Sequence, residues 1–523
     1  MNGSISRIVI VGGGSAGWLT AGLLASEHIA RAGRDISVTL IESPDVKTIG
    51  VGEGTWPTMR ATLRKIGISE AEFLLRCSAS LKQGTQFVGW VTGDDADRYY
   101  HPFSAPAAYT NLNLVPYWQA QQDKVSFVDA VSVQGYLCDR NLAPKQASTP
   151  EYAGVVNYGY HLDAGRFSEL LREHCTRHLG VRHILDHVTT INGEPDGDIR
   201  SLTTKVNGDL EGDLFIDCTG MASLLLGRHY GIRYRDRANI LFNDSALAAQ
   251  VPYPDEADPV ASQTISTAQP AGWIWDIGLA SRRGIGYTYS SGHTTDEAAE
   301  QALRAYIERT TGMPADTIEP RKIAFRPGHR EKFWHRNCVA VGMAAGFLEP
   351  LEASALVLVE LAGKMLSEEL PANRQVMDIV AQRYNDVFLY RWDRIIDFLK
   401  LHYLLSRRTH SDYWVCNRRP ESVPDSLGRL LELWRYHVPW HNDFRQRDEI
   451  FPAASYQYVL YGMGFETETR PIVADSEDAR QARDLFVANH RKAREIVPRL
   501  PSNREFLATV ARQGLPTDRP ERP

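Results

Sequence analysis

Residues 7–18 read RIVIVGGGSAGW, and this stretch decides the fold. Its first five residues form a β-branched apolar run, which is typical of a buried parallel strand. Gly12, Gly14 and Gly17 then give the G-x-G-x-x-G spacing, and an apolar helical segment follows. In this motif the first glycine permits a tight turn, the second lets a pyrophosphate approach the backbone, and the third lets the helix pack closely on its strand. The stretch predicts a Rossmann-like α/β domain that binds a dinucleotide.

A second predicted strand, residues 36–41, supports this interpretation because it ends at Glu42. Glu42 lies 25 residues after Gly17, where the motif places an acid that binds a ribose hydroxyl. A glycine-rich turn alone is a weak signal, since such turns are common in proteins that bind nothing there. The strand, turn, helix and acid occur together here, which favours a dinucleotide site over a turn without a ligand.

Length and composition exclude several broad classes of protein. The 523 residues are 43% hydrophobic and 23% charged, as in a large globular chain rather than a disordered or membrane-spanning one. A formal net charge of −6 argues against a nucleic-acid partner. The N-terminal apolar segment is broken by the glycine turn and lacks a basic leader, unlike a signal peptide. The six cysteines have neither metal nor disulfide spacing, so we expect free thiols, no metal site and a cytoplasmic location.

Two features follow Glu42 before the middle of the chain. Residues 50–54 (GVGEG) set three glycines between a strand and a helix, which predicts a bare backbone strap against which a flat ligand can lie. A helix is expected at roughly 58–75. Lys82 then stands at the start of a strand that runs from Gly84. By itself, a lysine at a strand edge is usually a solvated charge.

Residues 94–149 are rich in loops and aromatic side chains. This composition fits either a ligand-facing insertion or a satellite core under long loops. The apolar strand 214–217 is expected to return the chain to the dinucleotide sheet.

Residues 272–279 (GWIWDIGL) alternate as a strand does, so that Trp273 and Trp275 share one face. Paired tryptophans are usually core, and a wall beside a flavin is the alternative. We expect the hairpin partner at 285–291, with residues 282–284 in the turn. A helix at 295–311 is expected to cover this sheet.

A second loop of small residues follows the predicted strand 337–342 and leads into a helix at 356–368. A strand, a small-residue loop and a helix N-terminus together make a second anion-binding position. Capping of the first helical turn by Glu352 and Ser354 is the alternative. The chain beyond residue 371 is helical and rich in aromatic residues, with helices expected at 376–406, 427–436, 456–461 and 477–496.

Taken in order, these motifs resemble the flavin-dependent tryptophan halogenase family. Residues 12–18 are similar to its nucleotide loop, and residues 51–57 (VGEGTWP) to its flavin strap. Lys82 falls at the position of the family's active lysine. Residues 273–277 (WIWDI) match most of its W-x-W-x-I-P signature, and residues 347–352 (FLEPLE) match the segment that carries its catalytic glutamate. The ordered set is far more specific than any one motif.

The resemblance implies a Rossmann-like FAD-binding domain with a mixed sheet, similar to flavin monooxygenases, and a mainly helical C-terminal lobe. We place the FAD-binding halogenase module at residues 1–371, with a substrate-facing insertion at about 94–149. The helical substrate lobe is placed at 372–513. Residues 514–523 are rich in proline and charge, and we expect a disordered tail there.

The resemblance also implies a two-component reaction. Reduced FAD, supplied by a separate NAD(P)H-dependent flavin reductase, reacts with O2 and chloride or bromide to give hypohalous acid. This electrophile travels through the protein to an electron-rich aromatic substrate such as indole, tryptophan or a phenol. Lys82 would hydrogen-bond the electrophile or carry it as a haloamine, and Glu352 would position the active halogen and stabilise the cationic ring. A homodimer is left open.

Site residues carried over from the family fall into three groups. The cofactor contacts are Gly12, Gly14, Ser15, Ala16, Gly17, Glu42, Val51, Gly54, Met343 and Leu356. The halide contacts are Ser354 and Ala355. The substrate contacts are His101, Phe103 and Tyr456.

Two positions depart from the family pattern and leave the substrate and regiochemistry open. Gly278 stands where the signature has proline, and Ala353 stands where members specific for tryptophan usually have serine. A single-component flavin-dependent aromatic hydroxylase is the alternative function, and Lys82 and the tryptophan pair argue against it. A flavin-binding protein without catalysis is a third interpretation, opposed by the presence of both Lys82 and Glu352.

Overall fold

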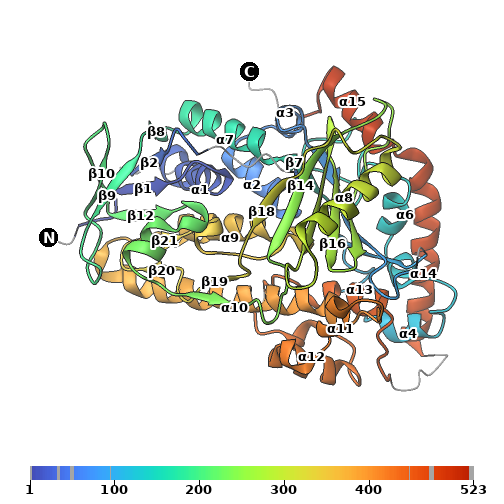
Figure 1. Ribbon diagram of the computed structural model, residues 1–523. Helices are drawn as coiled ribbons and strands as arrows, with labels where there is room; N and C mark the ends of the chain where they lie inside the picture. The colour runs from blue at the N-terminus through green and yellow to red at the C-terminus, as the bar shows by residue number, and fades with distance from the viewer. Residues whose placement is uncertain are drawn as a thin grey trace. The chain divides into compact units, whose positions relative to one another are not determined.

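The computed structural model describes residues 3–31, 36–46, 52–94, 96–446, 448–469 and 476–517 (Figure 1). The chain forms two compact units, and each is assembled from three separate segments. Unit 1 contains Met1–Ala79, Leu162–Arg237 and Arg326–Trp392. Unit 2 contains Ser80–His161, Ala238–Phe325 and Asp393–Pro523. The predicted domain boundary after residue 371 stays a prediction.

Unit 1 is built on a six-stranded sheet in the order β20-β21-β12-β1-β2-β8. All neighbouring strands are parallel except β20, which is antiparallel to β21. The strands are β1 (Arg7–Val11), β2 (Ser37–Glu42), β8 (Arg182–Leu185), β12 (Leu214–Asp217), β20 (Trp334–His335) and β21 (Cys338–Ala340). The predicted strands near 7–11, 36–41 and 214–217 are confirmed. Since β1 lies between β2 and β12, the strand order reverses at its carboxyl end, where such sheets bind ligands.

Helices cover this sheet in unit 1. α1 (Ser15–Ala25) packs against α7 (Ala164–His178) and α9 (Ser354–Glu368) (Figure 1). The helix predicted over 58–75 is wrong as one element, because the structure has α2 (Thr58–Ile66) and α3 (Glu70–Arg76). Gly67 adopts a left-handed φ of +88° that ends α2, and the hydroxyl of Ser69 accepts a hydrogen bond from the Glu72 backbone to begin α3.

The remaining elements of unit 1 are short. They are a π-helix at Ser26–Arg31, β3 (Gly52–Gly54), β9 (Val188–Asn192), β10 (Ser201–Thr204), β11 (Asp209–Glu211), β13 (Tyr234–Asp236), β19 (Gly328–Arg330) and β22 (Gly346–Phe347), with turns of 3-10 or π-helix at Gly220–Ala222, Leu224–His229, Gly342–Ala344 and Leu351–Ala353.

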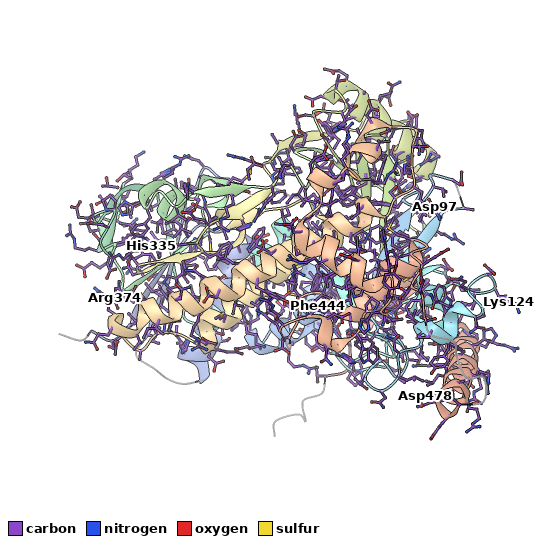
Figure 2. The ribbon with its side chains drawn as sticks, turned by 90° about the horizontal axis from the view of Figure 1, so that it is seen from below. Asp97, Lys124, His335, Arg374, Phe444 and Asp478 are labelled. Carbon is purple, nitrogen blue, oxygen red and sulfur yellow. The ribbon has the colours of Figure 1, made fainter. Side chains whose placement is uncertain are left out.

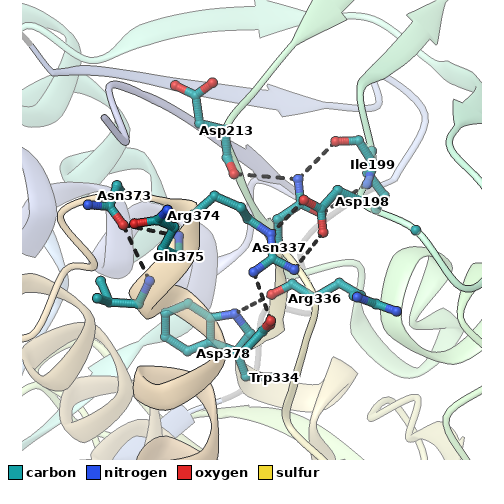
Figure 3. Close-up of polar contacts among 12 residues, drawn as sticks. Asp198, Ile199, Asp213, Trp334, Arg336, Asn337, Asn373, Arg374, Gln375 and Asp378 are labelled. Atoms are coloured by element: carbon teal, nitrogen blue, oxygen red, sulfur yellow. Dashed lines mark hydrogen bonds and ion pairs between the residues drawn. The ribbon is translucent and has the colours of Figure 1, made fainter. Parts of the chain in front are cut away.

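The long helix α10 (Arg374–Leu404) begins in unit 1 and ends in unit 2. Arg374 lies at its first turn (Figure 2), where its guanidinium is 2.6 Å from Asp198 and 3.0 Å from Asp378 (Figure 3). Asn337, next to β21, donates a 2.8 Å hydrogen bond to the carbonyl of Ile199. These contacts fasten the start of α10 and the edge of the sheet to the loop around residue 198.

Unit 2 is built on a seven-stranded sheet in the order β18-β14-β17-β16-β15-β5-β6. Only the pair β15–β5 is parallel. The strands are β5 (Gly84–Val88), β6 (Arg98–Pro102), β14 (Ser245–Pro252), β15 (Thr264–Gln269), β16 (Gly272–Gly278), β17 (Arg282–Tyr289) and β18 (Arg321–Ala324). The helix α8 (Asp296–Thr311) buries Leu303 and Ile307 against this sheet, as predicted.

The turn predicted at residues 282–284 is wrong, because these residues belong to β17. Gly278 pairs with Arg283, so the hairpin reverses between these two positions. Arg283 donates a 3.1 Å hydrogen bond to Asp276 on the neighbouring strand. This cross-strand ion pair extends the ladder where the basic residues and Gly284 indicated a loop.

The rest of unit 2 is mainly helical, which confirms the predicted helical C-terminal region. Its helices are α4 (Val115–Gln119), α5 (Phe127–Val131), α6 (Gln134–Cys138), α11 (Asp412–Cys416), α12 (Asp425–Trp434), α13 (Ala453–Gly462), α14 (Glu477–Ile496) and α15 (Asn503–Gln513), with 3-10 turns at Pro420–Ser422, His441–Asp443 and Val497–Arg499. Tyr99, Trp118 and Phe127 are buried, as expected for a satellite core. Within the described part of the chain, no helix is long and apolar enough to cross a membrane. Of the predicted disordered tail, residues 514–523, the carbonyl of Pro516 accepts a 2.9 Å hydrogen bond from the Glu151 backbone, and residues 518–523 lie outside the described residues.

Candidate active site

The glycine turn after β1 is fixed by its own backbone packing. Gly12 has a φ of +114°, and its N–H donates to the carbonyl of Ile41 at 2.8 Å. A Cβ on Gly12 would overlap the carbonyl oxygen of Cys218, and a Cβ on Gly17 would overlap that of Gly12. These two glycines are therefore required by the turn and by the approach of α1 to the sheet.

Gly14 differs from these two because a Cβ there would meet no protein atom within 4 Å. It is the N-cap of α1 and makes no side-chain capping bond. Ser15 directs its hydroxyl to that of Ser168, 3.0 Å away. Space beside an uncapped helix N-terminus fits a pyrophosphate, whose charge the backbone N–H groups would bind.

Glu42 lies beside this turn. Its carboxylate is 2.7 Å from Nε2 of His183, and a Cβ on Gly13 would overlap it. The acid therefore covers the backbone of the turn at the carboxyl end of β2. This is the position expected of a residue that binds a ribose hydroxyl, although its contact with the ligand stays a prediction.

A second glycine turn reaches the same edge of the sheet from far along the chain. Gly342, with a φ of +69°, follows β21, and a Cβ there would lie 2.7 Å from that of Ala16. A Cβ on Gly220 would lie 3.8 Å from Cε of Met343, whose side chain is 41% exposed. The predicted cofactor contacts Ala16 and Met343 thus lie at one edge of the sheet, with Gly220 beside Met343.

Asp217 is a structural residue of this edge whose role the sequence analysis missed. It is fully buried and accepts hydrogen bonds from the backbone of Leu225 and Leu226 at 2.9 Å and from the hydroxyl of Thr219 at 2.6 Å. These bonds fold the chain back after β12. An acid at the end of a buried strand, followed by Cys-Thr-Gly, was the available signal.

The predicted strap is described only from Gly52 onward, and Val51 lies outside the described residues. Gly54 is buried at the end of β3, and burial raises the pKa of Glu53 to about 7. The indole N–H of Trp56 donates a 2.8 Å hydrogen bond to the carbonyl of Glu352. This contact joins the strap to the predicted catalytic glutamate within unit 1.

Glu352 lies in a strained turn immediately before α9. Its φ is +67° and that of Ala353 is +54°, although neither is glycine, and each such conformation costs about 1 kcal/mol. Ala353 is the N-cap of α9 and makes no side-chain capping bond, and capping by Glu352 or Ser354 stays an alternative. Ser354 and Leu356 are buried and Ala355 is exposed. A side chain held by strain before a helix N-terminus is typical of a functional position.

Lys82 lies in unit 2 and is not a solvated charge. It ends β4 (Ser80–Lys82), pairs with Gly159 of the antiparallel β7 (Gly159–Asp163) and is 1% exposed. Its Nζ is 5.4 Å from the centre of the Phe103 ring. Burial and the charge of Lys82 hold the pKa of His161 well below its usual range, so this imidazole is neutral. Nε2 of His161 is 2.9 Å from the hydroxyl of Thr264.

The other two predicted substrate residues meet in one aromatic cluster of unit 2. His101, on β6, has its ring 5.5 Å from that of Phe398, and Tyr456, on α13, has its ring 4.9 Å from the same side chain. Phe398 stacks on Phe451 at 3.8 Å. The third predicted substrate residue, Phe103, lies beside Lys82. Of the three, one therefore contacts the lysine and two belong to the aromatic cluster.

The tryptophan pair is buried on one face of β16. Trp273 and Trp275 are 6.2 Å apart, and Trp275 covers the backbone of Gly286. On the opposite face, a Cβ on Gly278 would come within 3.0 Å of the Ala261 nitrogen and 3.2 Å of the Tyr253 hydroxyl. This crowding gives a physical reason for glycine where the family signature has proline.

Among the described residues, no three His, Cys, Asp or Glu side chains could hold an ion together. The cysteines are free thiols, and burial raises the pKa of Cys77, Cys175 and Cys338 above its usual value. The glycine turns and Glu352 lie in unit 1 and Lys82 lies in unit 2, and their roles in the chemistry stay predictions.

Known proteins share the sequence and architecture of this chain. The sequence model of the tryptophan halogenase family matches residues 7–478. A tryptophan 6-halogenase from Streptomyces toxytricini is 32% identical and covers 97% of this chain and 98% of its own. The crystal structure of a tryptophan halogenase from Shewanella frigidimarina covers 99% of both chains, with a TM-score of 0.95 and 51% identity. A flavin-dependent halogenase from Xanthomonas campestris covers 99% of this chain and 100% of its own, with a TM-score of 0.86 and 31% identity.

The fold and these matches define a flavin-dependent halogenase. The chain belongs to the tryptophan halogenase family. The resemblance drawn from the motifs and the predicted fold class are confirmed, while the roles of the individual site residues stay predictions.

Proposed function

We propose that this enzyme halogenates an electron-rich aromatic compound of the indole or tryptophan type, with Lys82 and Glu352 as its catalytic residues. Reduced FAD supplies the two electrons with which O2 and chloride or bromide give hypohalous acid. The burial of Lys82 beside a neutral imidazole and an aromatic ring is the observation that carries the proposal. The named relatives, a tryptophan 6-halogenase among them, support the substrate class.

The dinucleotide cradle of unit 1 holds the cofactor in this proposal. Gly12 and Gly17 shape the turn, the space at Gly14 admits the pyrophosphate, and Glu42 binds the ribose. The chloride or bromide ion binds at Ser354 and Ala355, where α9 begins and its N–H groups point outward. A separate NAD(P)H-dependent reductase supplies the reduced flavin, since the sequence has one dinucleotide motif.

Lys82 binds or carries the electrophile in this proposal. A buried ammonium donates hydrogen bonds to hypohalous acid and orients its halogen, and a buried free amine forms a haloamine with loss of water. Either route needs an amine that is shielded from water, because water would otherwise solvate the charge and admit other nucleophiles. His161 carries no charge there, so it adds no second positive charge beside the Lys82 ammonium.

Glu352 acts on the ring in this proposal. Addition of the halogen leaves a positive charge on the arene, and one proton must then leave the carbon that was attacked. A carboxylate stabilises that charge and receives that proton. His101, Phe103 and Tyr456 hold the arene by aromatic contact.

The enzyme acts in the cytoplasm in this proposal, and its free cysteines are consistent with that location.

A product assay tests the proposal. The protein receives FAD, a flavin reductase, NADH, O2 and chloride or bromide, with tryptophan, indole or a phenol, and products are identified by mass spectrometry. We expect a mass shift with the halogen isotope pattern. A shift of one oxygen atom would instead make the enzyme a hydroxylase, and NADH consumption without the reductase would indicate a single-component enzyme.

A matched pair of variants isolates the role of Lys82. Lys145 is also buried, and its Nζ lies 5.6 Å from the ring of Tyr158, but it donates to the carbonyl of Pro150 at 2.8 Å. We expect Lys82→Met to abolish halogenated product while FAD binding and peroxide release persist. Lys145→Met should lower stability but keep the product. Halogenation by Lys82→Met at the wild-type rate would disprove the role of Lys82.

A further inference from the structure

Trp56 and Glu352 are joined by a hydrogen bond between two distant segments of unit 1. Trp56 lies at the end of the strap, just before α2, and its indole N–H lies 2.8 Å from the carbonyl oxygen of Glu352. Glu352 itself is 6% exposed. A buried carbonyl in a turn needs a donor, and the fixed indole ring supplies one across 296 residues of sequence.

The backbone that this bond holds is strained at two successive residues. Glu352 and Ala353 both have left-handed φ values, which side chains other than glycine rarely adopt. Such a conformation persists only where the surroundings fix it. On one side, the Ala353 N–H donates to the carbonyl of Pro350 at 2.9 Å. On the other side, Trp56 fixes the direction of the Glu352 carbonyl, and with it the plane of the peptide between Glu352 and Ala353.

The helix that follows Trp56 is joined to α9 by hydrogen bonds. Two residues of the next helix, Thr58 and Thr62, donate hydroxyl hydrogen bonds to Glu360 at 3.2 and 2.6 Å. Glu360 is buried in α9, the helix that begins directly after Glu352 and Ala353. The start of α2 and the start of α9 are therefore tied together, and the donor and its acceptor cannot drift apart.

We propose that Trp56 is a positioning residue that sets the direction of the Glu352 side chain through the Glu352 carbonyl. The inference rests on the proposed catalytic role of Glu352. Without the indole donor, the peptide after Glu352 keeps the bond from the Ala353 N–H to Pro350 but loses the bond on its carbonyl, so it relaxes more easily toward an unstrained conformation, and the Cα–Cβ bond of Glu352 turns with it. Trp56 touches no reacting atom in this arrangement and acts only through the backbone.

Two substitutions remove the donor while keeping an aromatic ring. Trp56→Phe removes the indole N–H and part of the ring. Replacement of Trp56 by 3-benzothienylalanine exchanges only the N–H for sulfur, so it keeps the shape even if the phenylalanine variant folds poorly. We expect kcat for halogenation to fall about 10- to 100-fold in both, because displacement of a reacting group by about 1 Å has effects of this size. KM and FAD affinity should stay within about twofold.

Trp334 provides a matched control in the same unit. Its indole N–H also donates to the carbonyl of a residue with left-handed backbone, Arg336, at 3.0 Å and a φ of +53° (Figure 3). Trp334→Phe should lower the melting temperature but leave kcat and the ratio of product isomers unchanged. The Trp56 variants should broaden that ratio, since a misdirected carboxylate no longer favours one ring carbon. An equal loss of kcat in Trp334→Phe, or wild-type kcat and isomer ratio with 3-benzothienylalanine at position 56, would overturn the inference.

One further variant separates this inference from the function it rests on. Glu352→Gln should abolish halogenation and retain FAD binding. If it halogenates at the wild-type rate, the proposed role of Glu352 fails, and the positioning role of Trp56 fails with it. If Glu352→Gln is inactive and the Trp56 variants behave as wild type, only the positioning role fails.

Discussion

The carboxylate of Glu42 lies 2.7 Å from Nε2 of His183 and covers the backbone of Gly13 in the glycine turn. The acid at the end of β2 therefore lies against both the glycine turn and the neighbouring strand. His183 lies on the neighbouring parallel strand, opposite Leu40.

We expect Glu42→Ala to weaken FAD binding about 10-fold or more, because a charged acceptor for a ribose hydroxyl is lost. Titration of FAD fluorescence measures this change. Asp213 is a control at the opposite end of the same sheet, where it accepts bonds from the backbone of Ser6 and Arg7. If Asp213→Ala weakens FAD binding as much as Glu42→Ala does, the ribose contact is refuted.

Glu360 makes stability depend on pH in a direction opposite to most acids. Burial raises its pKa to about 8, from an ordinary value of 4.5. The folded protein therefore holds this proton more tightly than the unfolded chain does. The contribution of Glu360 to stability is complete below about pH 4.5 and is lost as the pH rises through 8.

Glu360→Gln removes this titration and keeps a polar partner for Thr58 and Thr62. We expect its melting temperature to exceed that of the wild type by about 3 °C or more at pH 9 and to equal it at pH 5. Differential scanning calorimetry at both pH values checks this. A difference that does not change with pH would show that Glu360 does not titrate in this range.

Ala353 has a left-handed φ of +54°, which glycine adopts without strain. We expect Ala353→Gly to raise the free energy of unfolding by about 0.5–1 kcal/mol, measured by urea denaturation. Ala61, which is exposed within α2, is the control, and Ala61→Gly should lower that free energy by about 1 kcal/mol. Destabilisation by both substitutions would contradict strain at Ala353.

Gly278 is crowded by Ala261 and Tyr253. We expect Gly278→Pro, which restores the family signature, to lower the free energy of unfolding by about 1–3 kcal/mol, because the neighbouring chain must shift. At Gly428, in α12, a Cβ would meet no atom within 4 Å, so Gly428→Ala should be neutral or stabilising. A Gly278→Pro variant as stable as the wild type would show that the crowding relaxes freely.

The parts of the fold that could be predicted carry local signals. The strand at 7–11, the glycine turn and the start of α1 follow from a few adjacent residues, and so do the ends of α8 and α14. The break between α2 and α3 was also readable, because Gly67 and the Ser69-x-x-Glu72 pattern mark a helix end and a new start. The prediction of a turn at 282–284 was wrong because Arg283 pairs with Asp276 on the neighbouring strand, a contact that the local sequence does not reveal.

Only the site residues that stand in sequence motifs could be predicted, and the contacts between them could not. The glycines, Lys82 and Glu352 stand in recognisable patterns, whereas the bond from Trp56 to Glu352 joins residues 296 positions apart without any local pattern. The five hydrogen bonds that the buried Asp217 carboxylate accepts also depend on tertiary packing, and so does the contact of Glu42 with His183. The strain at Glu352 is likewise a property of the folded backbone.

The second glycine turn, at Gly342, has a consequence for how the enzyme is made. The first turn is synthesised at residue 12, but the edge that it shares with Gly342 and Met343 is complete only after β21 has been made. At about 5–20 residues per second, the ribosome takes on the order of 20–60 s to cover that distance. During this interval the nascent chain has the first glycine turn but lacks the second one, at Gly342. Flavin supplied during translation therefore meets the complete edge only after this interval.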